Sequence, residues 1–193
     1  MQAAADFEDA VLGLALDADL EAALREAGRE RADPARAMAA LMRAQRLAPD
    51  HPAVLIAFYR HHFYDHRLSA ARDIARRALV VGARALGLPA VWREVPGRPL
   101  PDAMHDPRTR FYLFVLKGYA YLSLRLHDRV EARDALALLR LLDPEDCVGA
   151  AVLESVRLRA EAHADDDDEP LPYVQATGAA AWPQPRPESV VLR

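Results

Sequence analysis

The clearest hydrophobic pattern in the chain runs from Phe111 to Asp146. Apolar residues recur there every three or four positions, on both sides of a polar break at 127–129: Leu113, Leu116, Ala120 and Leu124, then Ala132, Ala135, Leu136, Leu139 and Leu142. This spacing places the apolar side chains on one face of each of two helices. Pro144 ends the second helix, because proline cannot continue a helix and restricts the residue before it. The pattern therefore predicts a helical hairpin.

The same pattern occurs twice more, earlier in the chain. Ala37, Leu41, Ala44, Leu47 and Pro49 align without a gap with Ala132, Leu136, Leu139, Leu142 and Pro144. Another copy follows directly, with Leu55, Phe58, Tyr59 and His62 in its first helix and Ala71, Ala75 and Ala78 in its second, and with Ala83 in place of the final proline. We therefore predict helical repeats over about 18–51, 52–85 and 113–146.

This order of residues resembles the tetratricopeptide repeat (TPR), a helix-turn-helix unit of about 34 residues. The residues that carry the resemblance are Leu116, Tyr119, Ala120, Ala132, Leu136, Leu139, Leu142, Asp143 and Pro144. Ala120 stands where the family has a glycine between its aromatic positions. The resemblance implies an all-α fold, a short right-handed array of TPR-like helical hairpins. It also implies that the first helix of each hairpin lines a concave surface that contacts a partner.

A looser resemblance covers most of the chain. The stretches LAPDHPAVLIAFYRHHFYDHRLSAARDIARRAL, GARALGLPAVW and RFYLFVLKGYAYLSLRLHDR are similar to small TPR proteins encoded beside bacterial nitrogen-fixation genes. This resemblance implies an accessory factor that acts on nitrogenase components or on their assembly.

The segments outside the repeats have different compositions. A short helix is expected over 3–16, and residues 1–163 would form one helical domain. Asp17 or Asp19, Asp33 before Pro34, and the run 50–52 are placed to begin helices. Glycines and prolines break the pattern over 82–110, which predicts a long loop in which Trp92 folds back onto the array or meets a partner. Residues 147–163 are expected to form a capping helix, and 164–193 a disordered acidic and proline-rich tail.

Bulk properties exclude several classes of protein. The 193 residues carry a formal net charge of −4, which gives no overall attraction to nucleic acid or to an anionic membrane. A single cysteine, Cys147, excludes an intramolecular disulfide. The N-terminus lacks the basic region of a signal peptide, and no apolar run approaches the length needed to cross a bilayer. We expect a cytoplasmic protein.

Motifs for catalysis or cofactor binding are absent from the sequence. It has no glycine-rich phosphate loop, nucleophile elbow or nucleotide fingerprint, so we expect neither an enzyme nor a cofactor. One alternative is a metal-binding protein or metal-dependent enzyme that uses His61, His62, Asp65 and His66. These residues are expected on one helix, where His62 and His66 project from the same face at the i, i+4 spacing of a metal-chelating pair.

The predicted partner-binding groove lies on the first helices of two repeats. It comprises Arg60, Phe63 and Tyr64, then Phe114, Lys117, Tyr121 and Arg125, with Trp92 as a further contact. Arginine and lysine bind carboxylates and aromatic rings give rigid apolar contacts, so an acidic peptide or protein edge is the expected partner. The alternative is that these aromatic residues belong to the core.

The acidic run 165–169 suggests a role for the tail. It could occupy the groove, with Trp182 as an anchor, and compete with an acidic partner. If it occupied the groove of another copy instead, the protein would be a self-assembling structural module.

Overall fold

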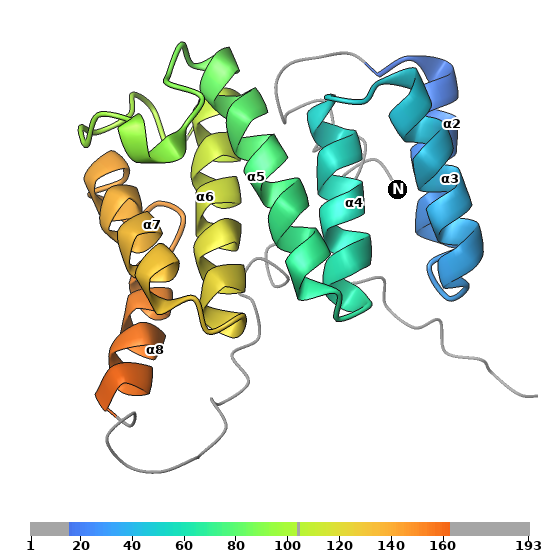
Figure 1. The fold of residues 1–193 in the computed structure, drawn as a ribbon. Helices are drawn as coiled ribbons and strands as arrows, with labels where there is room; N and C mark the ends of the chain where they lie inside the picture. Colours follow the sequence, from blue (N-terminus) through green and yellow to red (C-terminus); the bar gives the residue numbers. More distant parts are fainter. Residues whose placement is uncertain (1–15, 104, 163–193) are drawn as a thin grey trace, which may run out of the picture. The chain divides into compact units, whose positions relative to one another are not determined.

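A computed structural model describes residues 16–103 and 105–162, and all regular structure in them is helical. The helices are α2 (Ala18–Arg29), α3 (Pro34–Leu47), α4 (Pro52–Tyr64), α5 (Leu68–Ala85), the short 3-10 helix η1 (Trp92–Glu94), α6 (Pro107–Arg125), α7 (Arg129–Leu142) and α8 (Ala151–Ala162) (Figure 1). The chain divides into two compact units, residues 1–157 and 158–193. The predicted tail over 164–193, its proposed competition for the groove, and all but the last residue of the helix expected over 3–16 lie outside the described residues.

Helices α2 to α7 form three consecutive hairpins, α2–α3, α4–α5 and α6–α7. Helix α5 also packs closely against α6, whereas α3 and α4 have a smaller interface. This confirms the predicted all-α helical-hairpin array. The connection that was expected over 82–110 covers only 86–106, because α5 continues through Gly82 and Pro107 begins α6.

Short side chains before the helices set where they begin. Asp17, Asp33, Asp106 and Asp128 are N-cap residues whose carboxylates accept backbone N–H groups of the first turn. The run 50–52 departs from this pattern. There the N-cap is His51, whose Nδ1 accepts the Ala53 N–H at 3.2 Å. The helix that was predicted to begin here does so, but its N-cap is an imidazole in place of a carboxylate.

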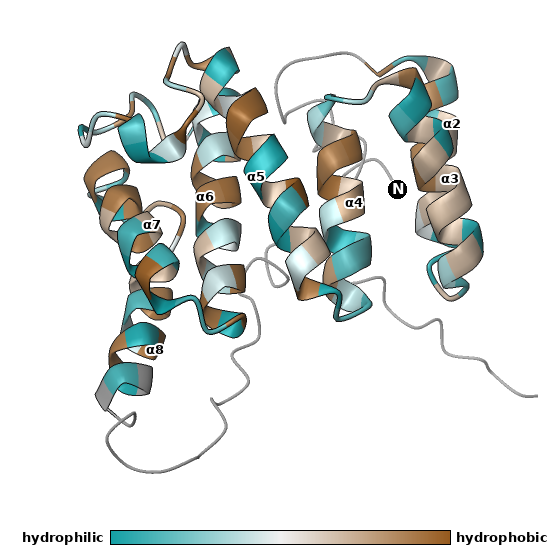
Figure 2. Ribbon diagram, viewed as in Figure 1, coloured by the Kyte–Doolittle hydropathy of each residue, from teal (hydrophilic) through white to brown (hydrophobic). Residues whose placement is uncertain are grey.

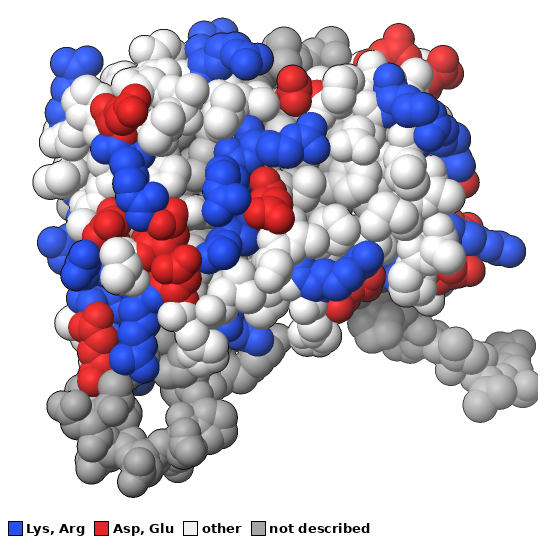
Figure 3. Space-filling view, viewed as in Figure 1, with Lys and Arg blue, Asp and Glu red and all other residues white. Residues whose placement is uncertain are grey.

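Helix α6 lies at the centre of the larger core and is buried on nearly all sides. Tyr112, Leu113, Leu116, Tyr119, Ala120 and Leu122 are all 0% exposed. The second helices differ from α6, because α5 and α7 alternate apolar and polar residues and keep one side in solvent (Figure 2). Gly118 allows α4 to approach α6, since a Cβ at this position would lie 3.0 Å from the Tyr59 hydroxyl. Basic side chains run over α5 on the side shown in Figure 3.

The C-terminal ends of α4 and α6 have the same backbone geometry. His66 and His127 adopt left-handed conformations, with φ of 57° and 59°. The next amide in each case reaches back along the helix, from Arg67 to the His62 carbonyl and from Asp128 to the Ser123 carbonyl, both at 2.9 Å. This is the Schellman arrangement that usually has glycine at the left-handed position. The turns inside the α4–α5 and α6–α7 hairpins therefore have the same geometry.

The left-handed histidines predict a simple stabilising substitution. His127→Gly is expected to raise the free energy of unfolding by roughly 0.5–1 kcal/mol, because glycine removes the clash of Cβ with its own backbone. Urea denaturation followed by circular dichroism measures this. His127→Ala is the matched control, since it removes the ring and keeps Cβ. Equal stability of the glycine and alanine variants would contradict the explanation.

Candidate protein-binding surface

Aromatic residues gather where the C-terminal halves of α4 and α6 meet. The Phe63 ring lies 6.0 Å from the Tyr121 ring, 5.6 Å from the Tyr64 ring and 6.0 Å from the nearly parallel Tyr59 ring, between centroids. Arg125 closes the group, because its Nη1 donates to the Tyr121 hydroxyl at 2.8 Å. The structure thus brings together four of the predicted binding residues, Phe63, Tyr64, Tyr121 and Arg125.

Exposure differs sharply within this group. Tyr64 is 59% exposed, while Tyr121 is only 7% exposed and packs against the Phe63 ring from the protein interior. Phe63 and Arg125 are half-buried, and Arg60, one turn before Tyr64 on α4, is exposed. We call Arg60, Phe63, Tyr64 and Arg125 the α4–α6 surface. It presents one open ring, one partly open ring and two guanidinium groups.

The sequence pattern assigned Tyr59 only to the first helix of the second repeat, and not to the binding residues. In the structure it stacks on Phe63 and contacts Gly118, so it holds the aromatic group against α6. Burial raises the pKa of Tyr59 well above its usual value, and the neighbouring Tyr121 and Tyr64 act in the same direction. Its hydroxyl is therefore neutral at physiological pH. The i, i+4 spacing of Tyr59 and Phe63 in the sequence already indicated that these two rings could be in contact.

Phe114 lies two helical turns before Tyr121. It is half-buried, and the guanidinium of the exposed Arg110 lies 5.9 Å from the centroid of its ring. This is a cation–π contact of the kind that presents an arginine on an aromatic support. Arg110 was not among the predicted binding residues, although its spacing of four from Phe114 on one helix face indicates the contact.

Lys117 was expected to point toward a partner, but its side chain is buried. It is 9% exposed, and its Nζ donates to the Val148 carbonyl oxygen at 2.6 Å. Burial lowers the pKa of Lys117, although the carboxylate of Asp146 opposes this shift. The residue ties α6 to the turn before α8. The predicted groove therefore lacks its lysine, because contacts 31 residues away in sequence turn that side of α6 inward.

Trp92 folds back onto the array, one of its two predicted placements. It is 7% exposed, its indole lies 5.9 Å from the Tyr119 ring, and the Arg93 guanidinium covers it at 4.3 Å from the ring centroid. This burial does not fit the predicted contact between Trp92 and a partner. The loop over 86–106 needs an apolar anchor on the core, and Trp92 supplies it.

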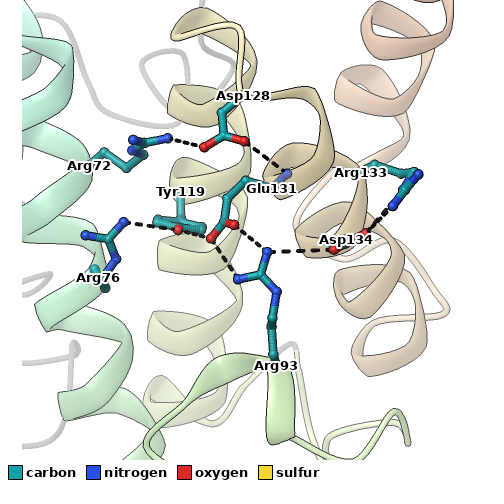
Figure 4. Close-up of polar contacts among 8 residues, drawn as sticks. All are labelled: Arg72, Arg76, Arg93, Tyr119, Asp128, Glu131, Arg133 and Asp134. Atoms are coloured by element: carbon teal, nitrogen blue, oxygen red, sulfur yellow. Dashed lines mark hydrogen bonds and ion pairs between the residues drawn. The ribbon is translucent and has the colours of Figure 1, made fainter.

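A polar network holds the same loop in place (Figure 4). Arg93 donates to both carboxylate oxygens of Glu131 on α7, and the Tyr119 hydroxyl donates to the same carboxylate. Arg76 from α5 reaches the Tyr119 hydroxyl at 3.5 Å. The hydrogen bonds from Arg93 hold the pKa of Glu131 below its usual value. The carboxylate of Glu131 is thus occupied by structural contacts.

The histidine cluster does not form the predicted metal site geometry. Helix α4 ends at Tyr64, and His66 follows in the left-handed conformation, so His62 and His66 are not on one helix face. His61 Nε2 instead accepts from Arg67 at 2.8 Å, and Asp65 also pairs with Arg67. No group of three His, Cys, Asp or Glu residues in the described parts of the chain could hold a metal ion.

His62 is half-buried and has one polar atom whose hydrogen bonding is unsatisfied. Its Nδ1 is buried and has no hydrogen-bond partner among the described residues. Burial lowers the pKa of His62, and Arg67 and His61 lower it further. The unfolded chain therefore binds the proton more tightly than the folded chain. It follows that stability falls as the pH drops from about 6.5 through the folded pKa.

His62→Phe is expected to remove this acid sensitivity. The ring fills the same space without a buried unsatisfied nitrogen, so we expect a gain of roughly 1 kcal/mol at pH 7. Below pH 6.5 the difference from the original protein should widen. Chemical denaturation at pH 7.5, 6.5 and 5.5 tests this, with the exposed His105→Phe as the control. A constant difference across the three pH values would contradict the assigned pKa direction.

A pocket of about 350 Å³ lies between the 99–105 segment and the turn at 142–147, where Cys147 forms part of its wall. Burial and the Asp143 carboxylate raise the pKa of the Cys147 thiol. The neutral thiol is therefore favoured over the thiolate.

Comparison with known proteins gives one relative that bears on function. The chain is 43% identical over 119 residues to an uncharacterised 19.8 kDa protein in the nifW 5' region of Azotobacter chroococcum mcd 1. The match covers 60% of this chain and 66% of that protein, slightly less than two thirds of its length. No protein-family model and no solved structure matches the chain. None of the helices in the described residues is long and apolar enough to cross a membrane.

Proposed function

We propose that this chain is a non-enzymatic, TPR-like protein-interaction module that acts in the cytoplasm as an accessory or assembly factor for nitrogen fixation. It binds a segment of another protein at the α4–α6 surface and needs no cofactor. The observation that carries the proposal is the exposed Tyr64 ring, held against Phe63 and flanked by Arg60 and Arg125 on a rigid helical array. Aromatic and arginine side chains in this combination are enriched at the centres of protein interfaces.

The repeat geometry supports the TPR assignment. Ala37, Leu41 and Ala44 on α3 and Ala71, Ala75 and Ala78 on α5 occupy equivalent buried positions, 34 residues apart. This equals the repeat length of the family. In such an array the first helices α4 and α6 lie side by side and can present one continuous surface.

The charge of the surface indicates the partner. Arg60 and Arg125 are cationic, Arg110 adds a third guanidinium along α6, and α4 contains no acidic residue. A segment that carries carboxylates next to an apolar side chain would match this arrangement through charge-assisted hydrogen bonds. With Lys117 buried, the cationic part of the surface consists of arginine alone.

The nitrogen-fixation setting rests on the relative in the nifW 5' region. Its position in that region motivates a partner among nitrogenase components or their assembly proteins. The aromatic and arginine side chains of the α4–α6 surface support protein binding, and the relative supplies the link to nitrogen fixation.

A capture experiment tests the proposal. Tagged full-length protein is incubated with soluble extract of nitrogen-fixing cells, and bound proteins are identified by mass spectrometry. We expect a nitrogenase component or assembly protein to bind the original chain and to be lost with Arg60→Glu/Tyr64→Ala. The matched control is Arg129→Glu/Val130→Ala on α7, because Val130 is 59% exposed, as Tyr64 is.

Equal capture by both variants would reject the α4–α6 surface as the site. If no protein linked to nitrogen fixation is captured, the proposed role in nitrogen fixation is rejected. Calorimetric titration with zinc and sedimentation at several protein concentrations test the two alternatives. Stoichiometric zinc binding would favour the metal protein, and a concentration-dependent mass would favour the self-assembling module.

A further inference from the structure

Helices α3 and α5 carry an unusual balance of charge. Together the two helices contain seven arginines and one acidic residue, Asp73. The arginines are Arg36, Arg43, Arg46, Arg72, Arg76, Arg77 and Arg84. Residues 16–162 as a whole hold 23 basic and 20 acidic residues, so these two helices are more basic than the described part of the chain on average.

The repeat places two of these arginines at equivalent positions. Arg43 and Arg77 are 34 residues apart, so they stand at equivalent positions on the second helices of neighbouring hairpins. Arg84 lies two turns beyond Arg77 on the same face of α5, and Arg46 lies one turn beyond Arg43 on α3. Figure 3 shows basic side chains over α5, in the middle of this side.

Existing contacts leave much of this charge available. Arg43 pairs with Glu26 and Arg77 with Asp50, but all four side chains remain at least 42% exposed. Such surface pairs contribute little to stability and can exchange partners. Arg46 and Arg84 are exposed and have no ion-pair partner among the described residues.

Apolar side chains accompany the arginines. Met42 is 50% exposed and Leu47 is 53% exposed, and they adjoin Arg43 and Arg46 on α3. Methionine and arginine are both enriched in protein interfaces. Neither α3 nor α5 contains an aromatic residue on which a nucleic-acid base could stack. The combination of exposed apolar groups with cations therefore favours a protein partner over a nucleic acid.

We propose that the outer face of α3 and α5, formed by Met42, Arg43, Arg46, Leu47, Arg77 and Arg84, is a second docking site that takes an acidic segment of another protein. The carboxylates of the segment pair with the arginines, and its apolar side chains contact Met42 and Leu47. This site is separate from the α4–α6 surface, so the array can hold two proteins at once and bring them together.

A defined peptide tests this site without knowledge of the natural partner. The probe is fluorescein-labelled (Glu-Glu-Leu)4, and its binding to the full chain is followed by fluorescence anisotropy at low and high salt. Arg46→Glu/Arg84→Glu reverses two charges without removing an ion pair seen in the structure. We expect it to weaken binding roughly tenfold or more, and Met42→Ala to weaken binding a few-fold.

The control variant is Arg31→Glu/Arg129→Glu, which makes the same charge change at exposed positions outside the face and should leave affinity within about twofold. (Gln-Gln-Leu)4 should bind far more weakly than the acidic probe. Circular dichroism confirms that each variant is folded.

Three results would overturn the inference: no binding of the acidic probe by the original chain, equal weakening by the control variant, or binding of a twelve-nucleotide oligouridine at least as tight as that of the peptide. Loss of peptide binding with Arg60→Glu/Tyr64→Ala, together with full retention in Arg46→Glu/Arg84→Glu, would also overturn it. That last pattern would still support the proposed function, so the two proposals are tested separately.

Discussion

Trp92→Ala is expected to lower the free energy of unfolding by about 3–5 kcal/mol, the usual cost of removing a large buried ring. The indole is 7% exposed and packs against Tyr119, and Arg93 covers its other face. Its removal leaves a cavity under the loop over 86–106 and loosens the Arg93 contact with Glu131. Guanidinium chloride denaturation followed by circular dichroism gives the change.

Val91→Ala is the control, because Val91 precedes Trp92 and is 53% exposed. We expect it to change stability by no more than about 0.5 kcal/mol. If Trp92→Ala left stability unchanged and abolished capture of a partner, Trp92 would be a binding residue and its placement in the core would be incorrect.

Lys117→Glu is expected to cost about 3–5 kcal/mol, comparable to breaking a buried charged contact. The substitution leaves the Val148 carbonyl oxygen without its donor and places a carboxylate near Asp146, which is already negative. Lys117→Met keeps most of the packing but loses the hydrogen bond to Val148 and the attraction to Asp146, so it should cost about 1–3 kcal/mol. Thermal and chemical denaturation of both variants measures these changes.

Arg110→Glu on the same helix is the matched control, since it makes the same charge change at an exposed position. Its stability should stay within about 0.5 kcal/mol of the original chain. Equal stability of Lys117→Glu and Arg110→Glu would contradict the burial of Lys117. The expected result also has a practical consequence: loss of partner capture by Lys117→Glu would report on folding and would say nothing about a binding surface.

The sequence predicted the hairpins well because their signals are local. Ala132, Leu136 and Leu139 lie on one face through the helical repeat alone, and each is at most 1% exposed. Asp33 before Pro34 caps α3 as expected, since a cap depends only on neighbouring residues. The end of α7 at Leu142, before Pro144, has the same local origin.

The sequence predicted the binding residues less completely, because α6 is buried on almost every side. Phe114, Lys117 and Tyr121 have helical spacings that fit several orientations of the helix, and only its neighbours decide which side is open. The segments that cover Lys117 and Trp92 come from distant parts of the chain, at Val148 and at Tyr119. Periodicity within α6 carries no information about these contacts.

By itself, the sequence determined that the chain is an all-helical array, where most of its helices begin and end, and which residues repeat. These properties depend on backbone hydrogen bonds and on side chains three or four positions apart. Only the tertiary structure decided that Lys117 and Trp92 are buried, that His66 turns away from His62, and that Phe63, Tyr64 and Arg125 share one surface. The physical reason is that exposure of a helix face depends on which distant segments pack against it.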